Sequence, residues 1–123
     1  MTVKKVNLTE AFARFSDHWS PKIVGDVNET QIKLAKIDGR FDWHHHAEED
    51  EMFLVVSGRM RMDLPDGPVE LSAGEFIIVP KGTDHCPESV GGECQIMLIE
   101  RAETRHTGNV TTEKTVHYYD RLI

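Results

Sequence analysis

The sequence has few cysteines, fewer basic than acidic residues, and no long apolar run. Its two cysteines, Cys86 and Cys94, cannot form a framework of several disulfides, and we expect both to be free thiols. The 14 Lys and Arg residues face 21 Asp and Glu residues, for a formal net charge of −7, so we expect no nucleic-acid partner. No apolar stretch approaches the roughly 18 residues of a membrane-spanning helix, so we expect no membrane partner either.

The first residues also lack the pattern of a secretory signal. After Lys4 and Lys5 the sequence soon turns polar, without the apolar segment that follows the basic residues of a signal peptide. A length of 123 residues suits one domain, and 39% hydrophobic beside 28% charged residues is typical of a globular protein. We therefore predict a single cytoplasmic domain spanning residues 1–123.

One helix is predicted at residues 8–16, where apolar side chains recur at spacings of three and four. Beyond Pro21, turns rich in Gly and Pro separate short apolar stretches, which favours an antiparallel sandwich or barrel. The tail, residues 103–123, has weak periodicity, and it either packs back across the barrel or joins a partner chain. The expected strands are residues 32–37, 51–56, 59–64, 69–71, 76–79, 83–86 and 94–99.

Strict alternation marks one of these strands. Arg59 and Arg61 alternate with Met60 and Met62, so the two pairs face opposite sides of a sheet. We expect the arginines to face outward. The two methionines, like Phe53, either belong to the core or line a cavity.

Three consecutive histidines provide the first candidate site. On a strand, His44 and His46 point to the same side and His45 to the other. Glu51 follows His46 by five positions, an odd number, so the chain must turn between them if both side chains are to meet. His85 lies far along the chain, shortly after a Pro-x-Gly turn, and a β-barrel can bring such distant strands together.

A set of three imidazoles and one carboxylate is suited to a single divalent metal ion. The ligand types favour Mn²⁺, Fe²⁺, Ni²⁺, Cu²⁺ or Zn²⁺ without choosing among them. Four protein ligands in an octahedral site leave two positions open for water, substrate or dioxygen, as a catalytic metal site requires.

Two motifs around these residues resemble those of the cupins. The first reads Gly, His-x-His, Glu and, after six further residues, Gly. The second reads Gly, five residues, Pro-x-Gly, two residues and His. Here the motif positions are Gly39, His44, His46, Glu51 and Gly58, then Gly74, Pro80, Gly82 and His85. Two departures are a Gly39–His44 gap one residue shorter than usual, and Ser89 in place of a common Asn.

The resemblance, whose motif core is residues 39–89, implies an all-β fold. It is a double-stranded β-helix (jelly-roll) barrel, here with a short N-terminal helix. The resemblance also implies a metal ion near one mouth of the barrel, held by His44, His46, Glu51 and His85, a small-molecule ligand and often a homodimer.

The reaction is not fixed by the resemblance, because this fold carries many functions. We favour a small metalloenzyme of dioxygenase or isomerase type acting on a small polar molecule, with Glu51 as both ligand and proton acceptor. The alternatives are a non-catalytic binding or sensing module, and a fold-only role such as a dimeric interaction protein. Some similar chains are loosely described as like mannose-6-phosphate isomerase, yet the basic residues near the motifs are few, with Lys81, Arg59 and Arg61 among them.

The remaining charged and imidazole side chains near or outside the motifs have plainer interpretations. Glu48, Glu49 and Asp50 are expected to form a solvated acidic rim. Cys86 directly follows His85, so we expect its thiol to face away from the metal. Surface or packing roles are expected for three histidines outside the motifs, His18, His106 and His117.

Overall fold

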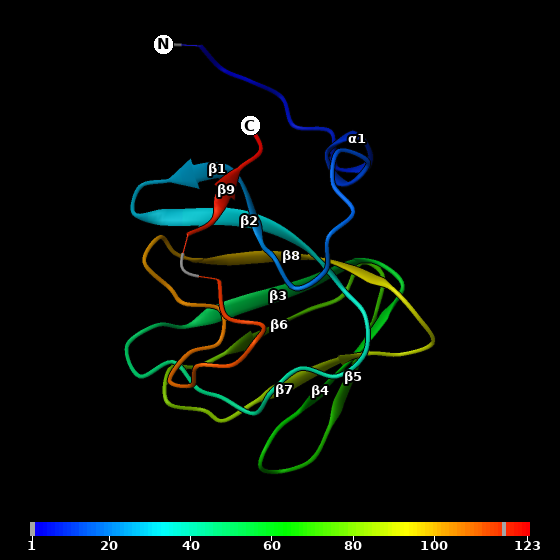
Figure 1. The fold of residues 1–123 in the computed structure, drawn as a ribbon, viewed down its shortest axis with the longest axis vertical. Helices are drawn as coiled ribbons and strands as arrows, with labels where there is room; N and C mark the ends of the chain where they lie inside the picture. The colour runs from blue at the N-terminus through cyan, green and yellow to red at the C-terminus, as the bar shows by residue number, and fades with distance from the viewer. Residues whose placement is uncertain (1, 117) are drawn as a thin grey trace.

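The computed structural model describes residues 2–116 and 118–123, and these form two β-sheets with one short helix (Figure 1). The elements are α1 (Leu8–Phe12), β1 (Lys22–Val27), β2 (Thr30–Ile37), β3 (Glu51–Ser57), β4 (Arg59–Asp63), β5 (Val69–Ser72), β6 (Phe76–Val79), β7 (Cys86–Ser89), β8 (Cys94–Arg101) and β9 (Asp120–Arg121).

One sheet has six strands in the order β6-β3-β8-β2-β1-β9, and the other has three in the order β5-β4-β7. All neighbours pair antiparallel except β1 and β9, which run parallel. The all-β prediction is confirmed. The two sheets enclose the core without being joined by strand pairing into one closed barrel.

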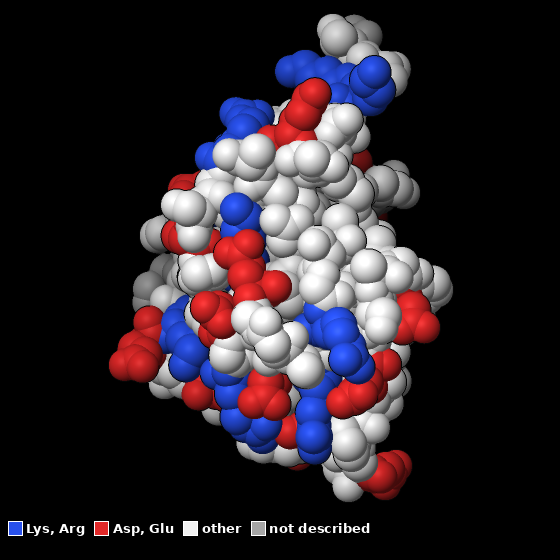
Figure 2. Space-filling model, turned by 90° about the vertical axis from the view of Figure 1, so that its right-hand side faces the viewer, with Lys and Arg blue, Asp and Glu red and all other residues white. Residues whose placement is uncertain are grey.

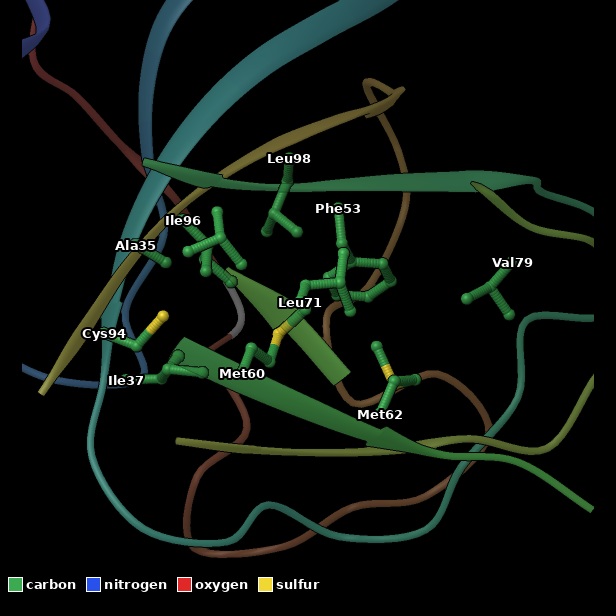
Figure 3. Packing of buried hydrophobic residues seen from close by; sticks show 11 residues of the cluster. Ala35, Ile37, Phe53, Met60, Met62, Leu71, Val79, Cys94, Ile96 and Leu98 are labelled. Carbon is green, nitrogen blue, oxygen red and sulfur yellow. The ribbon is translucent and has the colours of Figure 1, made fainter. Parts of the chain in front are cut away.

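The core lies between the facing sheets (Figure 3). Burial alternates along β3 and β8, so every second side chain of these strands points inward. Met60 and Met62 point up from β4 to meet Phe53 and Leu98 from the large sheet, and both methionines are fully buried. Leu71 of β5 completes this contact from the small sheet.

The apolar pattern of β2 is explained by cover on both faces. Ala35 and Ile37 point into the core between the sheets, while Leu34 points to the outer face. There Leu34 packs against Ala11 and Phe12 of α1. Both faces of the strand are therefore covered along this stretch, which is why its sequence lacks simple alternation.

The helix is shorter than predicted. Asn7 caps it by accepting a hydrogen bond from the backbone N–H of Glu10 at 2.9 Å. The helix ends at Phe12, not near residue 16, and the Phe15 carbonyl instead accepts a hydrogen bond from the Lys36 ammonium on β2. A tertiary contact thus replaces the last helical turn. This helix is not long and apolar enough to cross a membrane, and the described residues contain no other helix.

Several strands differ from the sequence prediction. The predicted strand at residues 83–86 lies later, at β7, because His85 forms only an isolated bridge. β1 and β9 were not predicted. The tail packs back on its own chain, where β9 runs beside β1 (Figure 1).

Charged side chains of both signs are interspersed on the molecular face shown in Figure 2. Lys and Arg lie beside Asp and Glu there, and a largely uncharged area lies to the right of the middle. A continuous basic area, the usual footprint of a nucleic-acid binder, is not present on this face.

Candidate metal centre

Backbone pairing places two of the predicted ligands side by side. The His44 N–H donates to the His85 carbonyl at 3.0 Å, and the His85 N–H donates to the His44 carbonyl at 2.8 Å. Phe41 extends this pairing by donating to the Pro87 carbonyl at 2.9 Å. His46 is then fixed by its carbonyl, which accepts the Gly82 N–H at 2.7 Å. The Pro-x-Gly turn thus holds the His-x-His segment.

Glu51 enters the site from the large sheet. It is the first residue of β3, after the turn that its odd spacing from His46 requires, and its backbone lies between Val79 and Glu100 on the neighbouring strands. Its side chain points inward and is only 2% exposed. A carboxylate is thereby carried to the same end of the core as the three imidazoles.

The four side chains form one buried cluster. His44, His46, Glu51 and His85 each offer a ligand atom, and these atoms lie within 4.8 Å of one another. Glu51 Oε1 lies 3.2 Å from His46 Nε2 and 3.6 Å from His85 Nε2. All three atoms are buried without a hydrogen-bond partner. Because buried polar atoms are normally satisfied, this convergence fits a metal ion as their common partner.

Backbone carbonyls set the orientation of two of the rings. His44 Nδ1 lies 2.8 Å from the Asp42 carbonyl, and His85 Nδ1 lies 2.8 Å from the Thr83 carbonyl. Since a carbonyl can only accept, Nδ1 carries the proton in each ring. Nε2 is then the unprotonated nitrogen, as a metal ligand must be.

Burial and neighbouring side chains together set the ionisation states of His44 and Glu51. Desolvation, followed by the nearby His85, lowers the pKa of His44 to about 4, so the ring is neutral at pH 7. Burial alone would raise the pKa of Glu51, but the surrounding polar side chains of Glu100, His46 and His85 outweigh burial and hold that pKa below its usual value. The donor set is therefore three imidazoles, of which that of His44 is held neutral, and one carboxylate.

An ion pair lies behind Glu51. Lys33 of β2 donates to Glu100 Oε1 of β8 at 2.9 Å, and both side chains are 0% exposed. The Lys33 ammonium also lies 4.1 Å from the centre of the Tyr119 ring. Burial and the charge of Glu51 raise the pKa of Glu100. Glu100, which contacts the candidate ligand Glu51, is therefore itself held by Lys33 of the neighbouring strand β2.

The segment that follows β8 closes this end of the core. Asn109 holds the His45 backbone from both sides, donating its N–H to the carbonyl at 3.0 Å and accepting the His45 N–H on its side chain at 2.9 Å. Gly108 passes so close that a Cβ there would lie 2.2 Å from the His45 carbonyl oxygen. Contact at this distance is possible only for glycine.

A small cavity of about 30 Å³ adjoins the cluster. Its walls include His44, Glu51, Phe53 and Phe41, together with His106 from the closing segment. The cavity holds roughly two water molecules at the usual volume needed for each. A ligand there would lie directly against two of the candidate metal ligands.

The match of residues 32–100 to the cupin domain model decides the family. The chain is a cupin. This cupin resembles a cupin-2 domain containing protein from Shewanella frigidimarina NCIMB 400, with 41% identity and a TM-score of 0.76, over 78% of this chain and 93% of the other. It also resembles protein NMB1881 from Neisseria meningitidis, with 32% identity and a TM-score of 0.72, over 80% of this chain and 99% of the other. The double-stranded β-helix prediction is confirmed.

A curated relative matches over a shorter stretch. Protein YdbB of Bacillus subtilis (strain 168) is 38% identical over 63 residues, which are 50% of this cupin and 56% of that protein. The match thus spans little more than half the length of YdbB.

The side chains around the cluster fall largely where the sequence placed them. His45 is turned from the cluster toward Asp84, at 3.1 Å. Glu48 and Asp50 are exposed, although Asp50 also accepts the Lys81 N–H at 2.9 Å. The Cys86 thiol contacts the Phe41 carbonyl at 3.2 Å.

The histidines outside the motifs have different positions. His18 is exposed and paired with Glu93 at 2.8 Å, as a surface role predicts. His106 is buried and lines the cavity, so its assignment to a plain surface or packing role missed its place beside the site. His117 lies outside the described residues.

Lys33 and Glu100 were also missed by sequence reasoning. A signal was present. On β8, Glu100 lies two residues after Leu98 and four after Ile96, so it shares their inward face. On β2, Lys33 lies two residues before Ala35 and shares the inward face of that strand. Opposite charges that extend the inward faces of two strands indicate a buried ion pair once those strands are known to be neighbours.

Proposed function

We propose that this cupin is a metal-dependent enzyme acting on a small molecule, with one divalent ion held by His44, His46, Glu51 and His85. The observation that carries the proposal is the convergence of three buried, unpartnered ligand atoms on one point. The donor set suits Mn²⁺, Fe²⁺, Ni²⁺, Cu²⁺ or Zn²⁺.

The bound ion would supply Lewis acidity and, if it is redox-active, electrons for dioxygen chemistry. The chain's own residues supply the rest. Glu51 is proposed both as a ligand and as the proton acceptor, because it is the carboxylate that lines the cavity. The apolar walls around it exclude water from the reacting molecule, which strengthens electrostatic interactions there.

We favour dioxygenase over isomerase chemistry. Dioxygen is small and apolar, so it suits a hollow of about 30 Å³ whose walls include Phe53, Ile96 and Leu98. Isomerisation by proton transfer is served better by two acid–base groups. Glu51 is the one carboxyl group among the described lining residues.

Elemental analysis of the purified protein beside its His44→Ala/His85→Ala variant is the first test. About one ion per chain, lost in the variant, would support the metal site and lead to oxygen-uptake assays with Fe²⁺ loaded. Product formed without oxygen uptake would favour the isomerase alternative. Tight binding of a ligand that is recovered unchanged would favour the binding or sensing module. No ion after reconstitution would contradict the proposal.

A homodimer is proposed through the edge of the large sheet. β6 is an edge strand, and Phe76 and Ile78 on it are 59% and 60% exposed. An open strand edge with exposed apolar side chains is a surface that a second copy can cover. Light scattering on Phe76→Glu should report a monomer where the parent is a dimer. Val27→Glu, at an equally exposed position on β1, is the matched control.

A cytoplasmic location and one functional unit spanning the chain also remain proposals. Support for the first comes from two buried free thiols, Cys86 and Cys94, which suit a reducing compartment. Support for the second comes from the tail, which packs against the site through Asn109. Cell fractionation and a single cooperative unfolding transition are the respective tests.

A further inference from the structure

Much of the cavity wall is made of carbon. Ala35, Ile37, Ile96 and Leu98 face it from β2 and β8 of the large sheet. Figure 3 shows these four side chains on the same side of the core, with Ile37 beside Met60 of the small sheet. None of them offers a hydrogen-bonding group, so any part of a ligand that reaches them must be apolar.

Stacked aromatic rings form the adjoining wall. The rings of Trp19 and Phe41 are 4.6 Å apart and nearly parallel, at 11°. The Phe41 ring also lies 5.6 Å from that of His106, tilted by 29°. Such a wall favours hydrocarbon over polar groups.

The imidazole of His106 belongs to this apolar wall, because its nitrogens face the closing segment. Nε2 lies 2.7 Å from the Lys114 carbonyl, so it carries the proton and donates to that oxygen. Nδ1 is directed at the hydroxyl of Tyr119, at 3.4 Å. The ring therefore presents carbon to the cavity. The indole N–H of Trp19 is likewise used, by donating to the Asp38 carbonyl at 3.2 Å. The polar side chains left in the lining are His44 and Glu51, both candidate metal ligands.

Among the described residues, the lining contains no lysine or arginine. The nearby Lys33 is held by Glu100 and covered by Tyr119. Two arginines of β4 lie on the outer face of the small sheet, where each is close to a carboxylate. Arg61 pairs with Asp63 at 2.9 Å, and Arg59 lies 3.5 Å from Glu70. A second negative charge on a ligand would thus be buried without a partner, which is strongly unfavourable.

We propose that the site selects molecules with oxygen donors at one end only, the rest being an uncharged hydrocarbon. Phosphorylated sugars and dicarboxylates are rejected, because their second charge would face the carbon wall. This inference rests on the metal site of the proposed function, and it names the substrate class of that site. Since the hollow is only about 30 Å³, a ligand of several carbons also needs Trp19, half-buried at the rim, to turn outward.

The test compares two ligands that differ at one group. (S)-2-hydroxybutyrate and L-malate have the same chelating 2-hydroxycarboxylate end, and malate carries a carboxylate where hydroxybutyrate has a methyl. Calorimetry on Zn²⁺-loaded protein, where oxygen chemistry cannot interfere, should show hydroxybutyrate binding at least tenfold more tightly. Equal or tighter binding of malate, or no binding of either, would overturn the inference.

A substitution at the rim sharpens the test. Trp19→Lys brings a cation to the cavity, so the ratio of malate to hydroxybutyrate affinity should rise at least tenfold. Trp43→Lys makes the same change at an exposed tryptophan outside the lining, and its ratio should stay at the parent value. A rise in both variants, or in neither, would overturn the inference.

Metal content separates this failure from failure of the proposed function. A protein that binds one Zn²⁺ per chain but prefers malate keeps its metal site and loses only the proposed selectivity. A protein that binds no ion in elemental analysis contradicts the proposed function itself, before either ligand is added. Melting temperature and zinc content of both tryptophan variants verify that each is folded and loaded.

Discussion

His44 and His85 are joined through their backbones by two hydrogen bonds, of 3.0 and 2.8 Å. Two candidate ligands from distant parts of the sequence therefore move as one pair. Because these bonds involve no side-chain atom, an imidazole can be removed without opening the pairing. The ligand set can thus be dissected by substitution.

Metal should stabilise the native protein through this pair. An ion that binds the folded chain alone raises the free energy of unfolding by about 2.7 kcal/mol at a concentration 100 times its Kd. Thermal unfolding of the parent should therefore shift upward on adding Zn²⁺, and that of His44→Ala should not. His18→Ala, at an exposed histidine, should shift like the parent. Equal shifts in the parent and His44→Ala would contradict the assignment.

Stability of the metal-free protein should depend on pH through His44. Its folded pKa is about 4, against 6.5 for an unperturbed histidine. Between these values the unfolded chain binds a proton that the native chain does not, so the free energy of unfolding rises with pH across this window and levels off above it. For this group the rise amounts to roughly 3 kcal/mol.

Urea denaturation of the parent and of His44→Gln, between about pH 4.5 and 7, measures this contribution. The rise should be clearly smaller in the variant, which lacks the titrating ring. Comparing the two proteins cancels the opposite contribution of Glu100, whose pKa is raised by burial and by Glu51. Identical pH profiles would mean that His44 is not buried in its neutral form.

The buried pair of Lys33 and Glu100 should be costly to break on one side. Lys33→Met leaves Glu100 in the core without its cation and should lower the free energy of unfolding by about 3 kcal/mol. Lys33→Met/Glu100→Gln should lose less than the single variant, because no unpaired charge remains. The control Arg59→Met, which removes an exposed pair with Glu70, should cost about 0.5 kcal/mol or less. A Lys33→Met protein as stable as the parent would refute this account.

Gly108 of the tail should be harder to replace than Gly91, which lies in the turn before β8. At Gly108→Ala the new Cβ would meet the His45 carbonyl oxygen at 2.2 Å and His44 Cδ2 at 2.9 Å. Gly91 also has a positive φ, of 76°, but a Cβ there meets nothing within 4 Å. Both substitutions cost about 1 kcal/mol for backbone conformation.

The collision adds to this cost only at Gly108. We therefore expect Gly108→Ala to lower the unfolding free energy by about 2 kcal/mol more than Gly91→Ala. It should also weaken Zn²⁺ binding, because the clash displaces the His44 segment. Calorimetric Zn²⁺ titration and urea denaturation of both variants give the measurement. Equal losses would show that the tail does not press on the site.

Much of the fold was predictable because local patterns specify it. The alternation of Met60 with Arg61, and the Gly and Pro turns, identified most of the strands. The helix at residues 8–16 was overestimated, because a tertiary hydrogen bond from Lys36 to Phe15 outweighs the local preference for another turn. β1 was missed because its apolar residues form no regular pattern, and its end beyond Gly25 is exposed.

The four candidate ligands were identified from sequence because their types and spacing carry the chemistry. Glu51 was placed correctly after a required turn, since an odd separation from His46 otherwise reverses its face. The walls of the cavity could not be derived in this way. Trp19 and His106 come from segments without strand periodicity, and their positions depend on contacts with Phe41.

The sequence by itself determined the all-β architecture and the set of candidate metal ligands, because strand alternation and motif spacing are local properties. Only the tertiary structure decided that Lys33 pairs with Glu100, which in turn contacts Glu51. Only the tertiary structure likewise decided that the tail packs against the site through Asn109. These contacts join segments far apart in the chain, and their geometry follows from how two sheets pack. No periodicity in the sequence records which strands become neighbours.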